Sequence, residues 1–255
     1  MTLGLPLSTL FGFLLVLARV SGVVMFFPVP GFRAAPDAVR VVISIAITIA
    51  LLPVWPVLPN KFPSISQLTA WAAIEAGFGL LIGVSIGFLL EGFQLAAHII
   101  GLQAGYGYST TIDPTSQADA GILQVFVSLM SGLLFFTLGL DRELIRILAA
   151  SFERFPAGAW HVTAISLDRV IHLGTGMMNT GVRLAMPVVA ILLVIDVALA
   201  LLGRIQQQLQ LLSLAFPLKM LASLALLTAL APIFPRIFSA AAASMVAGLW
   251  RGLLP

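Results

Sequence analysis

Residues 101–121 carry the polar side chains whose type and spacing stand out most in this otherwise apolar chain. The segment is rich in glycine, and it places Tyr106 and Tyr108 ahead of Asp113 and Pro114. Glycine adopts backbone conformations that other residues avoid. Irregular backbone beside membrane helices persists only where protein or an aqueous cavity surrounds it. The pattern therefore predicts part of a passage or a plug, with bulky tyrosines on a flexible backbone.

Each feature of this segment also has a simpler interpretation. Aspartate is a good helix N-cap and proline is favoured at the first helical position, so Asp113 and Pro114 could simply begin the next helix. Tyr106 and Tyr108 are the only tyrosines in the chain. They could anchor the chain at the membrane–water interface instead of filling a lumen.

Charged side chains inside the apolar runs form a second group of candidates. A charge in the middle of a bilayer costs roughly 3 kcal/mol or more on insertion scales. Each such residue should therefore pair, face a cavity or lie outside the hydrocarbon. Structural ion pairs between helices and a proton or substrate relay both remain open. The residues are Arg19, Glu75, Glu91, Arg183, Asp196 and Lys219.

Three glycines, Gly79, Gly83 and Gly87, recur every four residues and share one helix face. Such a ladder permits close helix–helix approach, either within the chain or at a subunit interface. The same residues with Ser85 match the Gly-x-Ser-x-Gly pattern of hydrolases. That motif needs a strand-to-helix elbow and His and acid partners, which this long apolar helix does not offer.

Composition sets the structural class. Of the 255 residues, 60% are hydrophobic and 9% are charged, against roughly 25% charged in soluble domains. Long continuous apolar runs favour helices over the short alternating segments of a β-barrel. The net charge of +3 includes no basic run that would indicate nucleic-acid binding. With no cysteine and no metal-ligand spacing among the three histidines, we expect no metal and no cofactor.

The sequence predicts an all-α membrane protein with about six long apolar segments, several of them kinked or forming helical hairpins. These segments cover about 5–27, 38–58, 65–104, 120–140, 170–202 and 211–250. As one straight helix, 65–104 would span roughly 60 Å, twice the thickness of a hydrocarbon core of about 30 Å. We therefore expect it to bend, double back or project beyond the bilayer. Ser64 to Gln67 reads as a capping box at its start.

Residues 141–156 differ from the apolar runs. Apolar residues recur there at helical spacing, with charged residues between them. This pattern predicts an amphipathic helix suited to a membrane interface. The apolar positions are Leu144, Ile147, Leu148, Phe152 and Phe155.

Four stretches together resemble the FliR family of flagellar biosynthetic proteins. The first runs from Leu17 to Arg40 and contains the turn Pro28-Val-Pro-Gly-Phe-Arg33. The others are Gly101 through Pro114, Phe136 through Pro156, and Asn179 to Pro187 with Asp196 and Arg204. The resemblance covers essentially the whole chain.

The resemblance implies that 1–255 is a single non-enzymatic subunit of the flagellar type III export gate, in the bacterial inner membrane at the basal body. It implies a helical assembly with P-type and Q-type subunits, a B-type switch protein nearby, and passage of unfolded flagellar proteins. Loop 105–119 would be the plug, with Tyr106, Tyr108 and Ile112 as its obstructing residues. The predicted plug residues are Gly105, Tyr106, Gly107, Tyr108, Ile112, Asp113 and Pro114.

Three alternatives remain beside this interpretation. The chain could be the homologous subunit of a virulence-type injectisome. A small-solute secondary transporter would use Glu75, Glu91 and Asp196 as a coupling site, but it expects two repeated halves, which are not visible. A membrane enzyme would need a catalytic constellation, and none is apparent.

Overall fold

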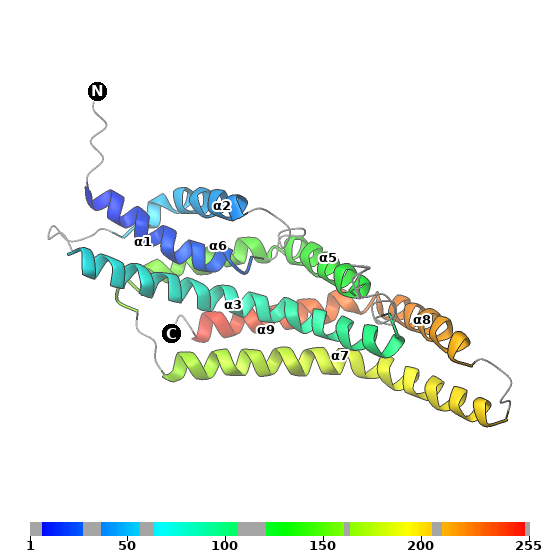
Figure 1. The fold of residues 1–255 in the computed structure, drawn as a ribbon. Coiled ribbons are helices and arrows are strands. Elements are labelled where there is room, and N and C mark those ends of the chain that lie inside the picture. Colours follow the sequence, from blue (N-terminus) through cyan, green and yellow to red (C-terminus); the bar gives the residue numbers. More distant parts are fainter. Residues whose placement is uncertain are drawn as a thin grey trace. The chain divides into compact units, whose positions relative to one another are not determined.

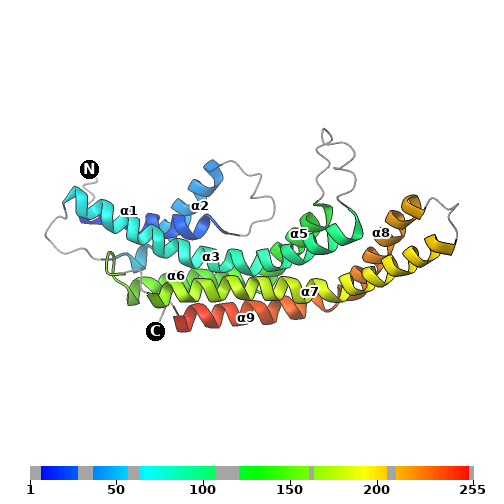
Figure 2. The ribbon, with the colours of Figure 1, turned by 60° about the horizontal axis from the view of Figure 1, so that its bottom comes forward.

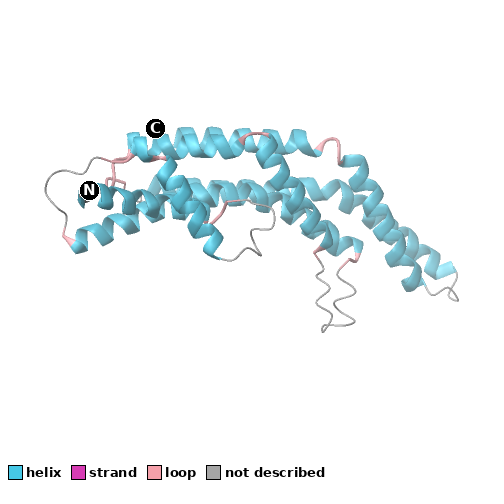
Figure 3. Ribbon diagram, turned by 90° about the horizontal axis from the view of Figure 1, so that it is seen from above, coloured by secondary structure: helices cyan, strands magenta, loops and turns pink. Residues whose placement is uncertain are grey.

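The computed structural model describes residues 7–27, 37–56, 64–106, 121–160, 164–205 and 211–252. Within these ranges the chain is helical and contains no strand (Figure 3). The predicted class of a helical membrane protein is confirmed. The helices are α1 (Leu7–Val24), α2 (Asp37–Ala50), the 3-10 turn η1 (Leu52–Val54), α3 (Ile65–Ala104), α5 (Ile122–Thr137), α6 (Leu140–Arg154), α7 (Ala164–Ile205), α8 (Leu211–Leu230) and α9 (Phe234–Gly252).

Helix α3 is one uninterrupted helix of 40 residues, so the option that 65–104 doubles back as a hairpin was wrong. Its start is fixed by the predicted capping box. The Ser64 amide donates to Gln67 Oε1 at 3.1 Å, and the Gln67 amide donates to Ser64 Oγ at 3.3 Å. These two bonds satisfy amides that a helix start leaves without a partner. The helix can therefore begin abruptly after the proline-rich segment.

Glycine and proline break two of the apolar runs. Helix α5 has 16 residues and is separated from α6 by Gly139, whose φ of +68° is left-handed. At about 24 Å, α5 alone is shorter than the bilayer-length segment predicted over 120–140. The run 211–250 divides at residues 231–233 into α8 and α9; Pro232 lies in this break and Pro235 is the second residue of α9. Pro187 and Pro217, by contrast, lie inside continuous helices.

Two helices are long and apolar enough to cross a membrane, α3 and the Val170–Ile205 part of α7. The number rises to four if α5 with α6, and α8 with α9, each count as one broken span. The chain thus contains the expected long apolar segments, but fewer than six of them are single helices of membrane-spanning length among the described residues.

The chain divides into two compact units. Unit 1 comprises residues 1–88, 135–173 and 242–255, and unit 2 comprises residues 89–134 and 174–241. In unit 1, α1 contacts both α2 and the first half of α3 (Figure 1). The contact between α1 and α3 is backbone against backbone. A methyl group on Gly79 would overlap the carbonyl oxygen of Arg19, and one on Gly83 would lie 2.9 Å from the carbonyl oxygen of Gly22.

The glycine ladder therefore faces α1 within the same chain, and Phe26, two residues beyond the end of α1, lies against Gly87. Helix α6 adds a third layer to unit 1. Its apolar residues Leu144, Ile147, Leu148 and Phe152 are buried among other side chains. This stripe packs against protein, and a location at a membrane interface stays a prediction.

Unit 2 joins the second half of α3 to α7, α8 and the start of α9. Gly92 and Gly181 let α3 and α7 approach closely, because a methyl on Gly181 would lie 2.8 Å from the carbonyl oxygen of Gly92. The ring of Phe93 contacts that of Phe234 edge-on and that of Phe238 in a tilted arrangement, with centroids 5.1 Å apart in each case. Helices α7 and α8 lie side by side beyond this point (Figure 2).

We predict that Gly79→Ala destabilises the protein by about 1–3 kcal/mol, the usual penalty for overpacking. The added methyl would overlap Arg19 backbone, so α1 and α3 would have to separate. Gly77→Ala is the matched control, because a methyl there meets nothing within 4 Å. The control should be neutral or stabilising by up to about 1 kcal/mol. Thermal unfolding of both purified variants measures the difference, and equal midpoints would contradict the close contact.

Candidate functional site

The side chains of Arg19 and Glu75 form the most deeply buried polar cluster in unit 1, and both are fully buried. Arg19 Nε donates to Glu75 Oε2. Arg19 Nη1 donates to Ser151 Oγ at 2.8 Å, and Nη2 donates to the carbonyl oxygen of Phe155 at 3.1 Å. The arginine of α1 thus reaches α3, the last turns of α6 and the residue that ends α6.

Glu75 uses its second oxygen in the same cluster. Oε1 accepts a hydrogen bond from the Gly158 amide at 2.9 Å. Gly158 has a φ of +77°, and a methyl there would lie 2.6 Å from the Trp71 ring, so glycine is required at this position. The Arg19 guanidinium also lies 4.0 Å from the centre of the Phe152 ring and 4.8 Å from that of Phe78, within the range of cation–π attraction.

This cluster has the properties of a structural ion pair. Its charges are matched, its carboxylate accepts two hydrogen bonds, and aromatic rings cover the guanidinium. Buried pairs of this kind are stable only when further hydrogen bonds satisfy the remaining polar atoms. The arrangement holds four chain segments together, and it provides no exposed group for proton transfer.

A second polar cluster lies in unit 2, where α3 ends. Lys219 Nζ of α8 lies 2.9 Å from Asp196 Oδ1 of α7 and 3.1 Å from Oδ2. Gln103 Nε2 of α3 donates to Asp196 Oδ2 at 3.0 Å. The lysine side chain is 13% exposed and that of the aspartate is 38% exposed. One carboxylate therefore connects three helices near the start of the central loop.

Tyr106, three residues after Gln103, forms a hydrogen bond with α8. Its hydroxyl donates to the carbonyl oxygen of Met220 at 3.3 Å, and Ser223 Oγ lies 3.4 Å from the same hydroxyl. Gly105 takes a φ of +85°, and a methyl there would lie 2.6 Å from the Phe216 ring. The left-handed glycine ends α3 and turns Tyr106 toward α8.

The other predicted plug residues, Gly107, Tyr108, Ile112, Asp113 and Pro114, lie outside the described residues. Of the remaining charges in apolar runs, Glu91 is half-buried on α3 and Arg183 is exposed on α7. The six charges thus include two pairs, one inside each unit. Sequence reasoning missed Ser151, Gly158 and Gln103, because nothing in their local sequence marks them as partners of a distant charge.

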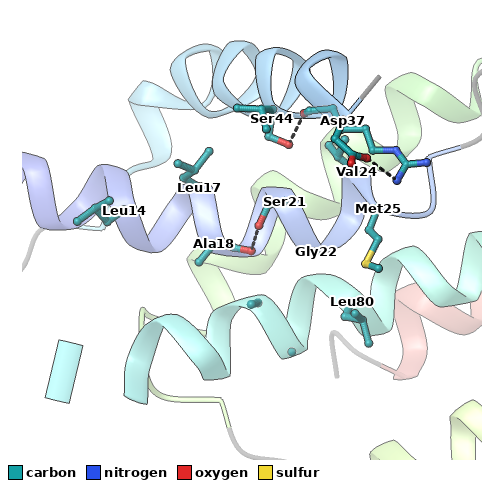
Figure 4. A pocket seen from close by; sticks show the side chains of 14 residues that line it. Leu14, Leu17, Ala18, Ser21, Gly22, Val24, Met25, Asp37, Ser44 and Leu80 are labelled. Atoms are coloured by element: carbon teal, nitrogen blue, oxygen red, sulfur yellow. Dashed lines mark hydrogen bonds and ion pairs between the residues drawn. The ribbon is translucent and has the colours of Figure 1, made fainter. Parts of the chain in front are cut away.

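An apolar groove of about 720 Å³ lies between α1, α2 and α3 (Figure 4). Leu14 and Leu17 of α1, Met25 just after α1, and Leu80 of α3 line it. The hydroxyl groups at its wall are already used, because Ser21 donates to the Ala18 carbonyl and Ser44 donates to the Arg40 carbonyl, each at 2.8 Å. The groove is mostly apolar, and its two charged lining residues, Asp37 and Arg40 of α2, form an ion pair with each other at 3.6 Å.

In the described part of the chain no metal-ligand cluster forms, and the Gly-x-Ser-x-Gly pattern does not have the surroundings of a hydrolase nucleophile. No group of three or more His, Asp or Glu side chains gathers there. Ser85 of the Gly-x-Ser-x-Gly pattern is buried in α3, where its hydroxyl donates to the carbonyl oxygen of Leu81 at 2.8 Å. This hydroxyl faces its own helix backbone, unlike the exposed nucleophile that the pattern denotes in hydrolases.

We predict that Glu75→Gln lowers the free energy of unfolding by about 3–5 kcal/mol, because it leaves a buried guanidinium without its counter-charge. Asp37→Asn is the matched control, since Asp37 also lies beside an arginine but its side chain is 95% exposed. We expect the control to show no measurable change. Unfolding of the purified variants by chemical denaturation tests this, and equal loss in both would contradict the structural role of the buried pair.

Comparison with known proteins places the chain in a family. The model of the family described as "Bacterial export proteins, family 1" matches residues 10–245. The chain is 29% identical to the flagellar biosynthetic protein FliR of Escherichia coli over 221 residues, which cover 85% of this chain and 83% of that protein. It is 25% identical to the FliR of Aquifex aeolicus, over 84% of this chain and 83% of that protein. Against the FliR of Bacillus subtilis the identity is 26%, over 84% of each chain. The chain belongs to family 1 of the bacterial export proteins.

Proposed function

We propose that this chain is a subunit of the flagellar type III protein export apparatus and is needed for flagellum assembly. The observation that carries this proposal is the family match over residues 10–245. It is supported by relatives that share the name flagellar biosynthetic protein FliR and align over more than four fifths of both chains. No specific observation favours an injectisome subunit or a small-solute transporter.

The subunit works together with other export subunits in the membrane, and we infer that these are the P-type and Q-type subunits with the B-type switch protein nearby. Its place would be the bacterial inner membrane at the flagellar basal body. The surface of the chain supports an assembled state. Helices α2, α5, α7 and α8 all expose large apolar side chains, such as Val42, Phe126, Val194 and Leu221, each at least 60% exposed.

Its role would be to form the passage for unfolded flagellar proteins, without catalysis. Within that role, loop 105–119 would obstruct the closed passage. The geometry at its first residues supports this assignment. Gly105 provides a left-handed turn, and Tyr106 is held on α8 through the Met220 carbonyl. The loop thus starts from a fixed point on α8.

We predict that flagellar protein export depends on this gene. In a strain lacking this gene, the culture medium should contain no exported hook or filament proteins, and the intact gene should restore them. Immunoblotting of the medium and of the cell pellet separates loss of export from loss of synthesis. Normal export in the deletion strain would contradict the proposed function.

We predict that loop 105–119 limits leak through the passage. Deleting residues 106–112 should raise the leak of ions or small solutes through the assembled export complex, because the obstructing side chains are gone. Tyr106→Phe is the matched control. It keeps the ring that would obstruct the passage and loses only the hydroxyl that contacts the Met220 carbonyl, so its leak should stay well below that of the deletion. Solute efflux from vesicles measures both, and an unchanged leak in a deletion complex of normal composition would rule out the plug assignment.

A further inference from the structure

One face of α7 is exposed and mostly apolar, with Asn179 and the cation Arg183 as its polar residues. We name it the Arg183 face, and it comprises Gly176, Asn179, Arg183, Ala190, Val194 and Leu201, all of them exposed. Their spacing of three, four and seven residues places them on one side of a helix. The opposite side, with Ala185, Val188, Leu192 and Leu199, is buried. Unit 2 therefore covers only the inner side of α7.

Arg183 differs from Arg19 and Lys219, the other two cations among the six candidate charges in apolar runs. Arg19 and Lys219 each pair with a carboxylate of the same chain. Arg183 makes no hydrogen bond or ion pair with any other residue that the structure describes. It nevertheless lies within the apolar span Val170–Ile205. An unpaired guanidinium in such a span raises the free energy of membrane insertion by roughly 3 kcal/mol or more. We therefore expect Arg183 to pair with a group outside the described residues.

Pro187 adds a second polar requirement at the same place. Proline has no backbone N–H, so the carbonyl oxygen of the residue four positions earlier loses its helical donor. In α7 that residue is Arg183 itself. Position 183 thus presents a guanidinium that needs an acceptor and a carbonyl oxygen that needs a donor, both on a mostly apolar surface.

We propose that the Arg183 face binds an apolar helix of another export subunit, and that this helix carries a carboxylate opposite Arg183 and a hydroxyl or amide donor beside it. The inference rests on the proposed function, because it requires other subunits. Such a helix would satisfy both polar groups of position 183 at once. The matching contact inside unit 2, where Asp196 accepts from both Lys219 and Gln103, shows the same chemistry in this chain.

Two other occupants fit this face less well. A lipid phosphate accepts hydrogen bonds from arginine but donates none to the Arg183 carbonyl. The face from 176 to 201 also extends about 38 Å along the helix, beyond a hydrocarbon core of about 30 Å. A second copy of the chain in a two-fold contact would bring like arginine faces together.

Reversing the charge of Arg183 tests whether the bound helix carries a carboxylate opposite it. With Arg183→Glu, the amount of other export subunits that co-purifies with the tagged chain should fall at least about tenfold, as expected for loss of a desolvated charge pair. Arg183→Lys keeps the charge and should retain most of the binding. Arg142→Glu on α6 is the matched control, since Arg142 is also exposed but lies off this face, and it should leave co-purification unchanged. Normal co-purification with Arg183→Glu would overturn the proposal.

A cross-link tests the occupant without altering charge. The chain has no cysteine, so Val194→Cys can carry a benzophenone group as its sole attached probe. Irradiation of intact membranes, followed by mass spectrometry, should give an adduct with another export subunit. An adduct with lipid or with a second copy of this chain would overturn the proposal even if Arg183→Glu were poorly folded.

These results separate the inference from the proposed function. If the deletion strain exports normally, the proposed function is contradicted, whichever molecule the probe at Val194→Cys cross-links. If export depends on the gene but the adduct is lipid, the function stands and the Arg183 face does not bind a subunit. An adduct with a subunit identifies the helix, and replacing its carboxylate with lysine should then restore co-purification to Arg183→Glu. Failure of every carboxylate on that helix to do so would contradict the charge pairing.

Discussion

The burial of one arginine–glutamate pair determines how unit 1 is assembled. Because neither charge has access to solvent, each polar atom must find a partner inside the protein. Arg19 on α1 therefore has to meet Glu75 on α3, and its remaining donors draw in the end of α6. The glycine contact follows from the same requirement, because Gly79 lets the α3 backbone approach the backbone of Arg19 directly. A larger residue there would separate the two charges.

Much of this fold follows from sequence patterns, because the patterns are local. The apolar runs predict α1 and α3, the charged and apolar spacing over 141–156 predicts α6, and Ser64 with Gln67 predicts the start of α3. Element ends were harder to predict. Gly139 adopts a left-handed conformation and shortens α5, whereas Pro187 and Pro217 are accommodated inside helices. Whether a glycine or proline ends a helix depends on tertiary packing, which a single sequence does not display.

The candidate sites could be predicted only in part, for the same reason. Charges in apolar helices stand out by type, so Arg19, Glu75, Asp196 and Lys219 were identified. Their pairing was not, because Arg19 and Glu75 lie 56 residues apart in the chain. Partners such as Gly158 are ordinary residues until the fold brings a carboxylate to their amide. The exposed Arg183 makes no pair with any described residue. Its partner lies outside the part of the chain that the structure describes, so neither the sequence nor this fold identifies it.

We infer that this chain is one part of a larger membrane assembly, in which other subunits cover its exposed apolar helices. The mass of the particle that contains it tests this most directly. The chain, tagged and extracted gently from native membranes, can be measured by native mass spectrometry. We predict a particle far heavier than the 27.0 kDa chain that contains other export subunits. A particle of one chain with lipid alone would contradict the account.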